Sequence, residues 1–161
     1  MAEATIRKGT RRDAAGFMGL LLGLAKFEHL EPPSSGGRKR LIEDIFARKR
    51  LKLLVALEGA KYVGYALYFY TYSSFLARPT LYLEDLFVSG ESRRKGVGFT
   101  LFRRCVDEAM KNGCGRMEWA VLTWNQKAMK FYEKLGARRL DDWYVYRMGS
   151  DDLRQVPRRL S

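Results

Sequence analysis

A turn rich in cations and glycines is the part of the sequence best suited to binding a charged ligand. Three consecutive cations, Arg93–Lys95, lead into Gly96 and Gly98, after an apolar stretch that ends at Val88 and before a segment with helical spacing. The first N–H groups of a helix have no partner within the helix, and the helix dipole is positive at that end. Glycines let phosphate oxygens approach the backbone. The turn therefore favours a phosphate site over a solvated basic loop.

Several other kinds of site are excluded by what the sequence lacks. The turn matches neither the dinucleotide motif Gly-x-Gly-x-x-Gly nor a P-loop ending in Gly-Lys-Ser/Thr. One histidine, His29, cannot form a histidine-rich metal centre, and the Gly-x-Ser-x-Gly elbow of a serine hydrolase is missing. Two cysteines, Cys105 and Cys114, are too few for a disulfide framework or a cysteine zinc site. We therefore expect no metal and two reduced thiols.

Length and charge indicate a single-domain protein with an anionic partner. The chain has 161 residues, of which 47% are hydrophobic, enough for one domain with a proper core. Its 30 Lys and Arg against 18 Asp and Glu give a formal net charge of +12. Such an excess favours nucleic acid, a membrane surface or a phosphorylated ligand. Because no apolar run is long enough to span a membrane and the N-terminus has no apolar signal core, we expect a cytoplasmic protein.

Hydrophobic spacing predicts helices and strands that alternate around one sheet. Apolar residues recur at helical spacing from Phe17 to Phe27, whereas Leu51–Leu57 and Tyr62–Tyr72 flank a short polar turn, as in a β-hairpin. This order predicts an α/β fold with one mixed sheet covered by helices. Strands are expected at 4–8, 51–57, 62–72, 80–88, 116–123 and 144–148, and helices at 12–29, 41–49, 96–111 and 125–135, with a loop at 31–37 and a polar tail at 150–161.

Two motifs together resemble those of the GCN5-related N-acetyltransferase (GNAT) superfamily. Arg93-x-x-Gly96-x-Gly98, which follows a strand, resembles the turn that binds the pyrophosphate of acetyl-CoA. The stretch Leu81–Val88 before it is most similar to the diamine (spermidine/spermine) and thialysine acetyltransferases. The second motif resembles the family's Asn…Phe-Tyr…Gly pattern and reads Asn125-x3-Met129-x-Phe131-Tyr132-x2-Leu135-Gly136-Ala137.

The resemblance implies a single GNAT-type domain over residues 1–149, followed by the polar tail at 150–161. Its sheet would be mixed and mostly antiparallel, with six to seven strands flanked by about four helices. Acetyl-CoA would be the co-substrate, with its pantetheine along the strand before the turn and its pyrophosphate on the N–H groups of the turn. Enzymes of this resemblance are commonly homodimers. The implied cofactor contacts are Leu86, Phe87, Val88, Arg93, Arg94, Lys95, Gly96, Val97, Gly98, Phe99, Asn125, Lys127 and Ala128.

Two residues are candidates for the proton transfers that accompany acetyl transfer to an amine. An alkyl ammonium has a pKa of about 10.4, so a carboxylate near the point of attack would have to take its proton. Glu84 is the candidate base; binding the amine, or pairing with an arginine, are its alternatives. In a regular strand its neighbour Asp85 would face the other way. By resemblance, Tyr132 would act as the general acid that protonates the departing CoA thiolate, with packing of a helix as its alternative role.

The resemblance also implies an acceptor site for a small primary amine. Two departures from the polyamine enzymes remove negative charge there. Ser73-Ser74 stands where those enzymes carry an acidic residue, and the loop after the first helix runs into the basic cluster Arg38–Arg40. These changes favour a short diamine or a thialysine-like amine over spermine. The implied substrate-binding residues are Phe27, Glu28, Glu84, Asp85, Glu118, Trp119 and Asp142, with Asp141 as an alternative to Asp142.

Two other functions fit parts of the sequence. A protein or peptide N-acetyltransferase would share the cofactor half and have an open groove in place of the acidic pocket. A basic nucleic-acid-binding module would use the cation clusters at 38–40, 48–50 and 93–95. These clusters are spread along the chain, and no aromatic–basic strand motif or recognition helix accompanies them. Nucleic acid is therefore the weaker expectation, and no membrane partner is expected.

Overall fold

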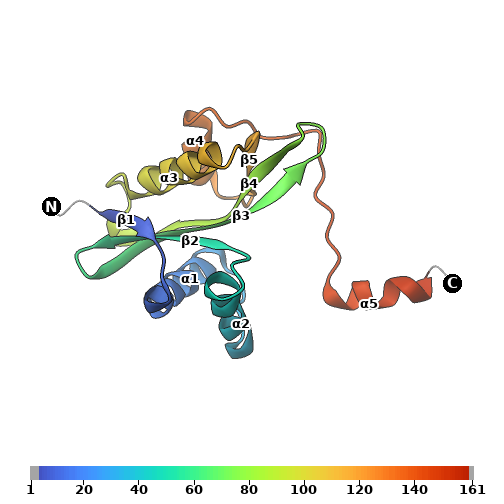
Figure 1. The fold of residues 1–161 in the computed structure, drawn as a ribbon, viewed down its shortest axis with the longest axis horizontal. Helices are drawn as coiled ribbons and strands as arrows, with labels where there is room; N and C mark the ends of the chain where they lie inside the picture. Colours follow the sequence, from blue (N-terminus) through green and yellow to red (C-terminus); the bar gives the residue numbers. More distant parts are fainter. Residues whose placement is uncertain (1–3, 160–161) are drawn as a thin grey trace. The chain divides into compact units, whose positions relative to one another are not determined.

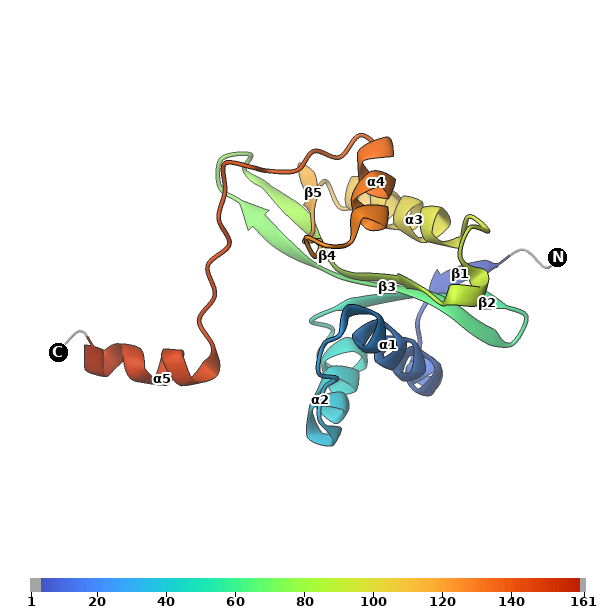
Figure 2. The same ribbon diagram turned by 180° about the vertical axis from the view of Figure 1, so that it is seen from behind.

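The computed structural model describes residues 4–159, which form two compact units. The first unit ends at Leu122 and holds the whole sheet, and the second begins at Thr123. Figure 1 and Figure 2 show the elements of both units along the chain. None of the helices in the described range combines the length and the apolar character needed to cross a membrane.

The sheet has five strands in the order β1-β2-β3-β4-β5. All neighbouring strands are antiparallel except β4 and β5, which run parallel. The mixed, mostly antiparallel sheet and the hairpin of β2 and β3 confirm the prediction, whereas the predicted count of six to seven strands is wrong. The strands are β1 (Thr5–Lys8), β2 (Lys52–Glu58), β3 (Lys61–Ser73), β4 (Arg78–Val88) and β5 (Arg116–Glu118).

Two segments that the sequence predicts as strands are a strand only in part or not at all. β5 ends at Glu118, although strand-like sequence continues to Thr123, and Tyr144–Met148 forms no strand within the described range. A strand needs a neighbouring strand to satisfy its backbone N–H and C=O groups. The side chains of Val145 and Tyr146 are highly exposed, at 87% and 91%. Strand propensity alone therefore does not decide whether these residues pair.

Helices cover both faces of the sheet in the first unit (Figure 1, Figure 2). α1 (Ala14–Glu28) and α2 (Ser35–Phe46) lie on one face, and α3 (Val97–Lys111) lies on the other. On the α1 side, the rings of Phe17 and Tyr65 meet edge to face with their centroids 5.0 Å apart. On the α3 side, Cys105 is fully buried. Because both faces are covered, the central strands have nearly continuous apolar sequences.

The start of α2 differs from the prediction. Apolar spacing predicted a helix from Leu41, yet α2 begins at Ser35 and includes two glycines of the expected loop. The hydroxyl oxygen of Ser34 accepts a hydrogen bond from the backbone N–H of Gly37 at 3.1 Å, which caps the helix. A serine cap supplies an acceptor for one of the unpaired first-turn N–H groups, and so it offsets the low helix propensity of glycine.

A buried carboxylate joins the start of α1 to the sheet. Asp13 is 1% exposed and accepts two hydrogen bonds from the guanidinium of Arg7, each at 2.7 Å. It also accepts from the backbone N–H of Thr10 at 2.7 Å and from the phenol of Tyr62 at 2.6 Å. The bonds from Arg7, followed by those from Tyr62 and Thr10, hold the pKa of Asp13 well below its ordinary value. These donors compensate for burying the charge and fix α1 against β1 and β3.

The second unit holds α4 (Gln126–Lys134) and α5 (Ser150–Arg159). α4 confirms the helix predicted at 125–135, and the Oδ1 atom of Asn125 caps it by accepting the N–H of Ala128 at 3.2 Å. The predicted polar tail at 150–161 is helical over α5. Asp151 and Asp152 lie in its first turn, where carboxylates interact favourably with the helix dipole.

Candidate functional site

A β-bulge in β4 sets the direction of the acidic side chains. Leu83 pairs with Tyr68 of β3, and Asp85 pairs with Leu67, so Glu84 is an extra residue with no partner across the ladder. The regular strand assumed for this position is therefore wrong. Because the bulge shifts the alternation by one residue, Asp85 lies on the α1 side of the sheet, whereas Leu83 lies on the α3 side.

Asp85 is the carboxyl group most strongly affected by its surroundings in this part of the first unit. It is half-buried, and the phenol of the fully buried Tyr65 donates a hydrogen bond to its Oδ2 atom at 3.1 Å. Burial raises the pKa of Asp85 to about 6, and the negative charges of Glu84 and Glu28 act in the same direction, against the lowering effect of the Tyr65 hydrogen bond. Burial and Asp85 together raise the pKa of Tyr65 far above its ordinary value. Near neutral pH, Asp85 can therefore accept and release a proton while Tyr65 stays a donor.

Glu28 brings a third carboxylate to the same region from the end of α1. His29, with φ of 56°, ends that helix in the left-handed conformation. Glu28 is half-buried, and burial raises its pKa. Its charge and that of Glu84 both act on Asp85 and on Tyr65. The structure thus gathers Glu28, Glu84 and Asp85 into one acidic cluster, which would attract a cation.

The predicted phosphate turn has the backbone geometry of an anion site. After the short 3-10 turn η2 (Gly90–Ser92), Arg94 and Gly96 adopt φ of 65° and 80°, and α3 begins at Val97 without a side-chain cap. The first helical bond to Gly96 comes from the N–H of Thr100 at 3.0 Å, so the earlier N–H groups have no partner within the helix. A Cβ atom added at Gly96 would meet no atom within 4 Å, which leaves the backbone open to a ligand.

The side chains of two of the three cations in the turn face protein groups. The Nε–H of Arg93 donates to the backbone oxygen of Val88 at 2.9 Å, and its guanidinium lies 4.5 Å from the centre of the Phe27 ring and 5.7 Å from that of Phe87. Lys95 pairs with Glu58 at 3.5 Å. Arg93 therefore joins the turn to the last residues of α1, next to Glu28. The turn and the acidic cluster are neighbours within the first unit.

The strand leading to the turn keeps one open edge. β5 pairs with β4 only as far as Tyr82, opposite Glu118. From Leu83 to Val88, β4 pairs with β3 alone among the strands of residues 4–122. Phe87 is buried in the core, whereas Leu86 and Val88 are half-buried. The open edge fits the predicted pairing of an extended, amide-bearing arm with this backbone.

Residues of β5 and the following segment have contacts of their own. The ring of Trp119 packs edge to face on Phe102 of α3, with the ring centroids 5.4 Å apart. Glu118 forms an ion pair with Arg116 at 2.8 Å. Trp119 therefore has a packing role and Glu118 a charge partner, which are common roles for a tryptophan and a glutamate in a fold. Binding of substrate by Glu118 and Trp119 stays a prediction.

The second unit carries the other predicted residues. Asn125 caps α4, Lys127 and Ala128 lie in its first turn, and the half-buried Tyr132 contacts the ring of Phe131 with the centroids 5.1 Å apart. Asp142 is exposed in the segment after α4. Their roles toward the cofactor and the amine stay predictions.

Sequence reasoning missed the partnership of Tyr65 and Asp85. Tyr65 lies 20 positions earlier, in an apolar run typical of a core strand, so its sequence context indicates packing and nothing more. The available signal was the pair Glu84-Asp85 within an otherwise apolar strand. A charged pair at such a place requires partners, and the hairpin brings β3 alongside to supply one.

Known proteins share both the sequence and the fold of this chain. The family model described as "Acetyltransferase (GNAT) family" matches residues 21–137. The thialysine N-epsilon-acetyltransferase of Sus scrofa is 30% identical over 97% of this chain and 98% of its own length. The L-ornithine N5-acetyltransferase NATA1 of Arabidopsis thaliana is 41% identical over 58% of this chain and 41% of its own length. An integron cassette protein of V. cholerae shares the fold with a TM-score of 0.82 and 23% identity, over 98% of this chain and 99% of its own.

Proposed function

Because this chain belongs to the GNAT family of N-acetyltransferases, which use acetyl-CoA, we propose that it acetylates the primary amine of a small substrate in one ternary complex. The observation that carries this proposal is the joining of an anion-binding turn to an acidic cluster. Arg93 of the turn packs on Phe27, the residue before Glu28. A polyanionic cofactor and a cationic amine can therefore meet in the first unit.

The cofactor would use mainly backbone groups of this chain. Its pyrophosphate would accept hydrogen bonds from the N–H groups of residues 94–99, where α3 begins without a side-chain cap. Its pantetheine amides would pair with the open edge of β4 at Leu86–Val88. Asn125, Lys127 and Ala128 are further cofactor contacts that the resemblance implies.

Proton transfer from the amine would use the acidic cluster. We assign Glu84, which is exposed, to bind the ammonium group, and Asp85 to take its proton directly or through a water molecule. The support for this division is the pKa of Asp85 at about 6, because a general base works best when its pKa is near the working pH. This division gives Glu84 the amine-binding role that is its alternative in the sequence-based prediction, in place of the role of base. Tyr132 would return a proton to the CoA thiolate as general acid.

The acceptor would be a short amine with a flexible side chain. Two relatives are named for the acetylation of thialysine and of ornithine. The first matches this chain over 97% of its residues, and the second over 58%. Ser73-Ser74 stands where the polyamine enzymes are acidic. Of these two serines, Ser73 is buried, and its hydroxyl accepts the N–H of Leu76 at 3.2 Å where β3 ends. This residue therefore has a structural task, and a long polycation would lose a site of attraction there.

Assembly and location follow as lesser parts of the proposal. Trp143, Tyr144 and Tyr146 are apolar residues with at least 73% exposure, which supports the expected homodimer. A cytoplasmic location is in line with the two free cysteines Cys105 and Cys114.

An acetyl-CoA assay that detects released thiol tests the proposal. Thialysine, ornithine, lysine, putrescine, spermidine and a short peptide would be compared at equal concentration. We expect the highest kcat/KM with thialysine, ornithine or putrescine and a lower value with spermidine. Turnover with the peptide alone would assign the chain to protein acetylation and contradict the small-amine proposal.

A further inference from the structure

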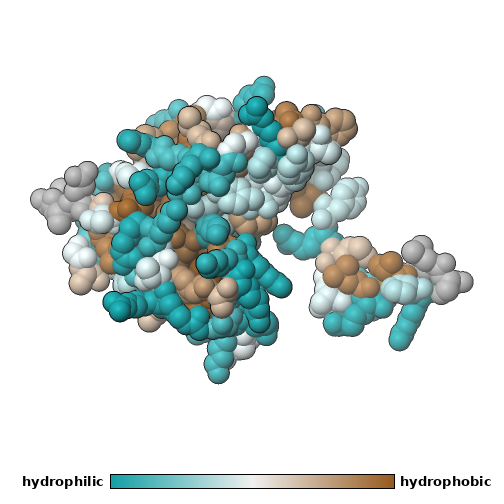
Figure 3. Space-filling view, in the orientation of Figure 1, coloured by the Kyte–Doolittle hydropathy of each residue, from teal (hydrophilic) through white to brown (hydrophobic). Residues whose placement is uncertain are grey.

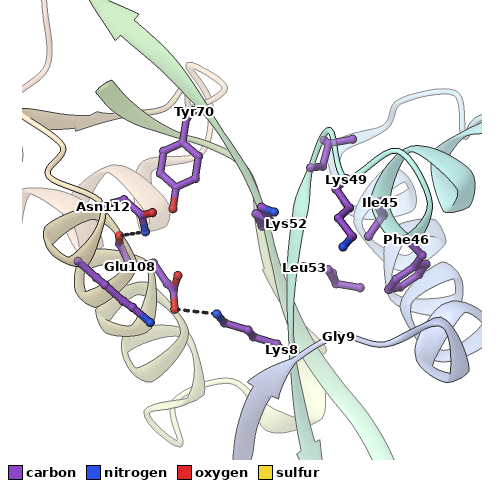
Figure 4. A pocket seen from close by; sticks show the side chains of 12 residues that line it. Lys8, Gly9, Ile45, Phe46, Lys49, Lys52, Leu53, Tyr70, Glu108 and Asn112 are labelled. Atoms are coloured by element: carbon purple, nitrogen blue, oxygen red, sulfur yellow. Dashed lines mark hydrogen bonds and ion pairs between the residues drawn. The ribbon is translucent and has the colours of Figure 1, made fainter. Parts of the chain in front are cut away.

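A cavity of about 460 Å³ lies at the edge of the sheet, where β1 ends. The last contact of this strand region is the hydrogen bond from the N–H of Gly9 to the oxygen of Leu53 at 2.8 Å. Beyond it, the start of β2 is uncovered between the end of α2 and the end of α3 (Figure 4). The lining residues belong to the first unit, and none is assigned above to acetyl-CoA or to the amine.

Positive charge dominates the lining of this cavity. Four lysines line it, and the only carboxylate among the lining residues is Glu108, which pairs with Lys8 at 3.5 Å (Figure 4). Within residues 4–159, Lys49, Lys52 and Lys111 form no ion pair. Three uncompensated ammonium groups therefore share one cavity. These lysines are exposed, and an anion bound between them would relieve the repulsion among their charges.

One wall of the cavity is apolar, whereas the lysines beside it are exposed. Ile45 and Leu53 are each 5% exposed, and Phe46 lies next to Lys49 on that side (Figure 4). An apolar wall lowers the local dielectric constant, so it would increase the attraction between an ammonium group and a bound anion. Lys49 has φ of 55°, a left-handed conformation that lysine rarely adopts, in the turn after α2. Strain of this kind is frequent at binding sites.

The opposite wall supplies a hydrogen-bond donor. Tyr70 of β3 extends its hydroxyl toward the cavity, and among the described residues this hydroxyl has no hydrogen-bond partner (Figure 4). Burial, and then the charge of Glu108, raise the pKa of Tyr70 to about 12, so the phenol keeps its proton at neutral pH. The side chain of Asn112 is fixed nearby by donating to the backbone oxygen of Glu108 at 2.7 Å.

We propose that this cavity is a second ligand site, separate from the acetyl-CoA turn, that binds a small polyanion through Lys49, Lys52, Lys111 and the hydroxyl of Tyr70. The volume suits a small molecule. Phosphate and carboxylate groups share the required chemistry. In Figure 3, hydrophilic residues cover most of the visible face of the first unit, yet a basic surface alone gives neither a cavity nor an apolar wall. The site thus gives a role to part of the net charge of +12 that is not assigned to acetyl-CoA binding.

Calorimetric titration of the CoA-saturated protein tests this site, since CoA then occupies the other anion site. Tripolyphosphate and citrate are the two probes, one for phosphate and one for carboxylate. The triple variant K49Q/K52Q/K111Q removes the proposed contacts. The triple variant K39Q/K130Q/K134Q removes the same charge at three exposed lysines elsewhere and is the matched control. Thermal unfolding of both variants checks that they are folded.

We expect one molecule of at least one probe to bind, with affinity about tenfold lower in the cavity variant and within twofold of wild type in the control. Preference for one probe identifies the anionic group. Tyr70→Phe, which leaves all charges in place, should weaken binding by a smaller factor. Equal losses in both triple variants, or no binding of either probe at millimolar concentration, would overturn the proposal. So would binding of a DNA duplex through these lysines without binding of either small probe.

Discussion

The guanidinium of Arg93 lies 4.5 Å from the centre of the Phe27 ring, and its Nε–H donates to the backbone oxygen of Val88. A residue of the phosphate turn therefore packs against the end of the first helix, beside Glu28. A cation over an aromatic face contributes roughly 0.5–2 kcal/mol, depending on how well the pair is desolvated. This contact joins the proposed cofactor site to the proposed acceptor site, so we expect a change at one to affect the other.

Removing that contact should affect both substrates. In Arg93→Ala, the end of α1 loses its packing partner, so we expect KM for the amine to rise at least as much as KM for acetyl-CoA. Arg94→Ala is the matched control, because Arg94 is an exposed neighbour in the same turn. It should raise KM for acetyl-CoA alone. Steady-state kinetics with each substrate varied in turn measures both constants, and an unchanged KM for the amine in Arg93→Ala would rule out the coupling.

Asp85 should determine the acid limb of the pH profile. Its pKa of about 6 means that the carboxylate is lost as the pH falls through that value, so kcat/KM for the amine should decline below it. In Asp85→Asn we expect kcat to fall by about 10²-fold and this limb to disappear. Glu84→Gln should raise KM for the amine more than it lowers kcat. A profile that keeps its acid limb in Asp85→Asn would return the role of base to Glu84.

Asp85→Asn should also stabilise the folded protein. The pKa of Asp85 is higher in the folded protein than its ordinary value of 3.8, so the folded state binds the proton more tightly than the unfolded chain does. Stability is then fully retained below the lower value and is lost as the pH rises from 3.8 toward about 6. At pH 7 Asp85→Asn should recover about 1–3 kcal/mol of unfolding free energy. Urea unfolding at pH 4 and pH 7 measures this, and equal effects at both pH values would contradict it.

Much of this arrangement follows from sequence patterns, and the rest depends on tertiary partners. The hairpin of β2 and β3, the helix α3 and the turn at Gly96 are local features, set by spacing and by residues that permit unusual φ values. The perturbed carboxyl of Asp85 was not predictable, because its pKa reflects burial under α1 and a bond from Tyr65. The bulge was equally hidden, since it is defined by pairing with β3 and not by the residues of β4 alone.

Tyr132→Phe should separate acid catalysis from binding. The hydroxyl is lost while the ring contact with Phe131 is kept, so folding and acetyl-CoA affinity should change little. We expect kcat to fall by about 10²-fold, the usual size of a general acid contribution. Binding of acetyl-CoA by calorimetry, measured beside turnover, distinguishes the two effects. Wild-type turnover in this variant would remove Tyr132 from the mechanism.

Gly98 should tolerate a methyl group but not a charge. A Cβ atom there would lie 3.6 Å from the Cγ2 atom of Val88, an ordinary contact, so Gly98→Ala should fold normally. Gly98→Glu places a carboxylate where the pyrophosphate is expected, and it should weaken acetyl-CoA binding by at least tenfold through repulsion at the helix N-terminus. Equal affinities in the two variants would mean that the phosphates bind elsewhere.

Because of the bulge at Glu84, the odd-numbered residues of β4 do not all lie on the same face of the sheet. Before it, Leu81 and Leu83 fill the core beneath α3; after it, Asp85 and Phe87 belong to the layer beneath α1. In a strand of the same length without the bulge, Asp85 would lie on the side of Leu83, and its carboxyl would enter the apolar core beneath α3. The bulge is therefore as much a requirement of the acidic cluster as the identity of its residues, because it lets β4 place two side chains two positions apart on opposite faces of the sheet.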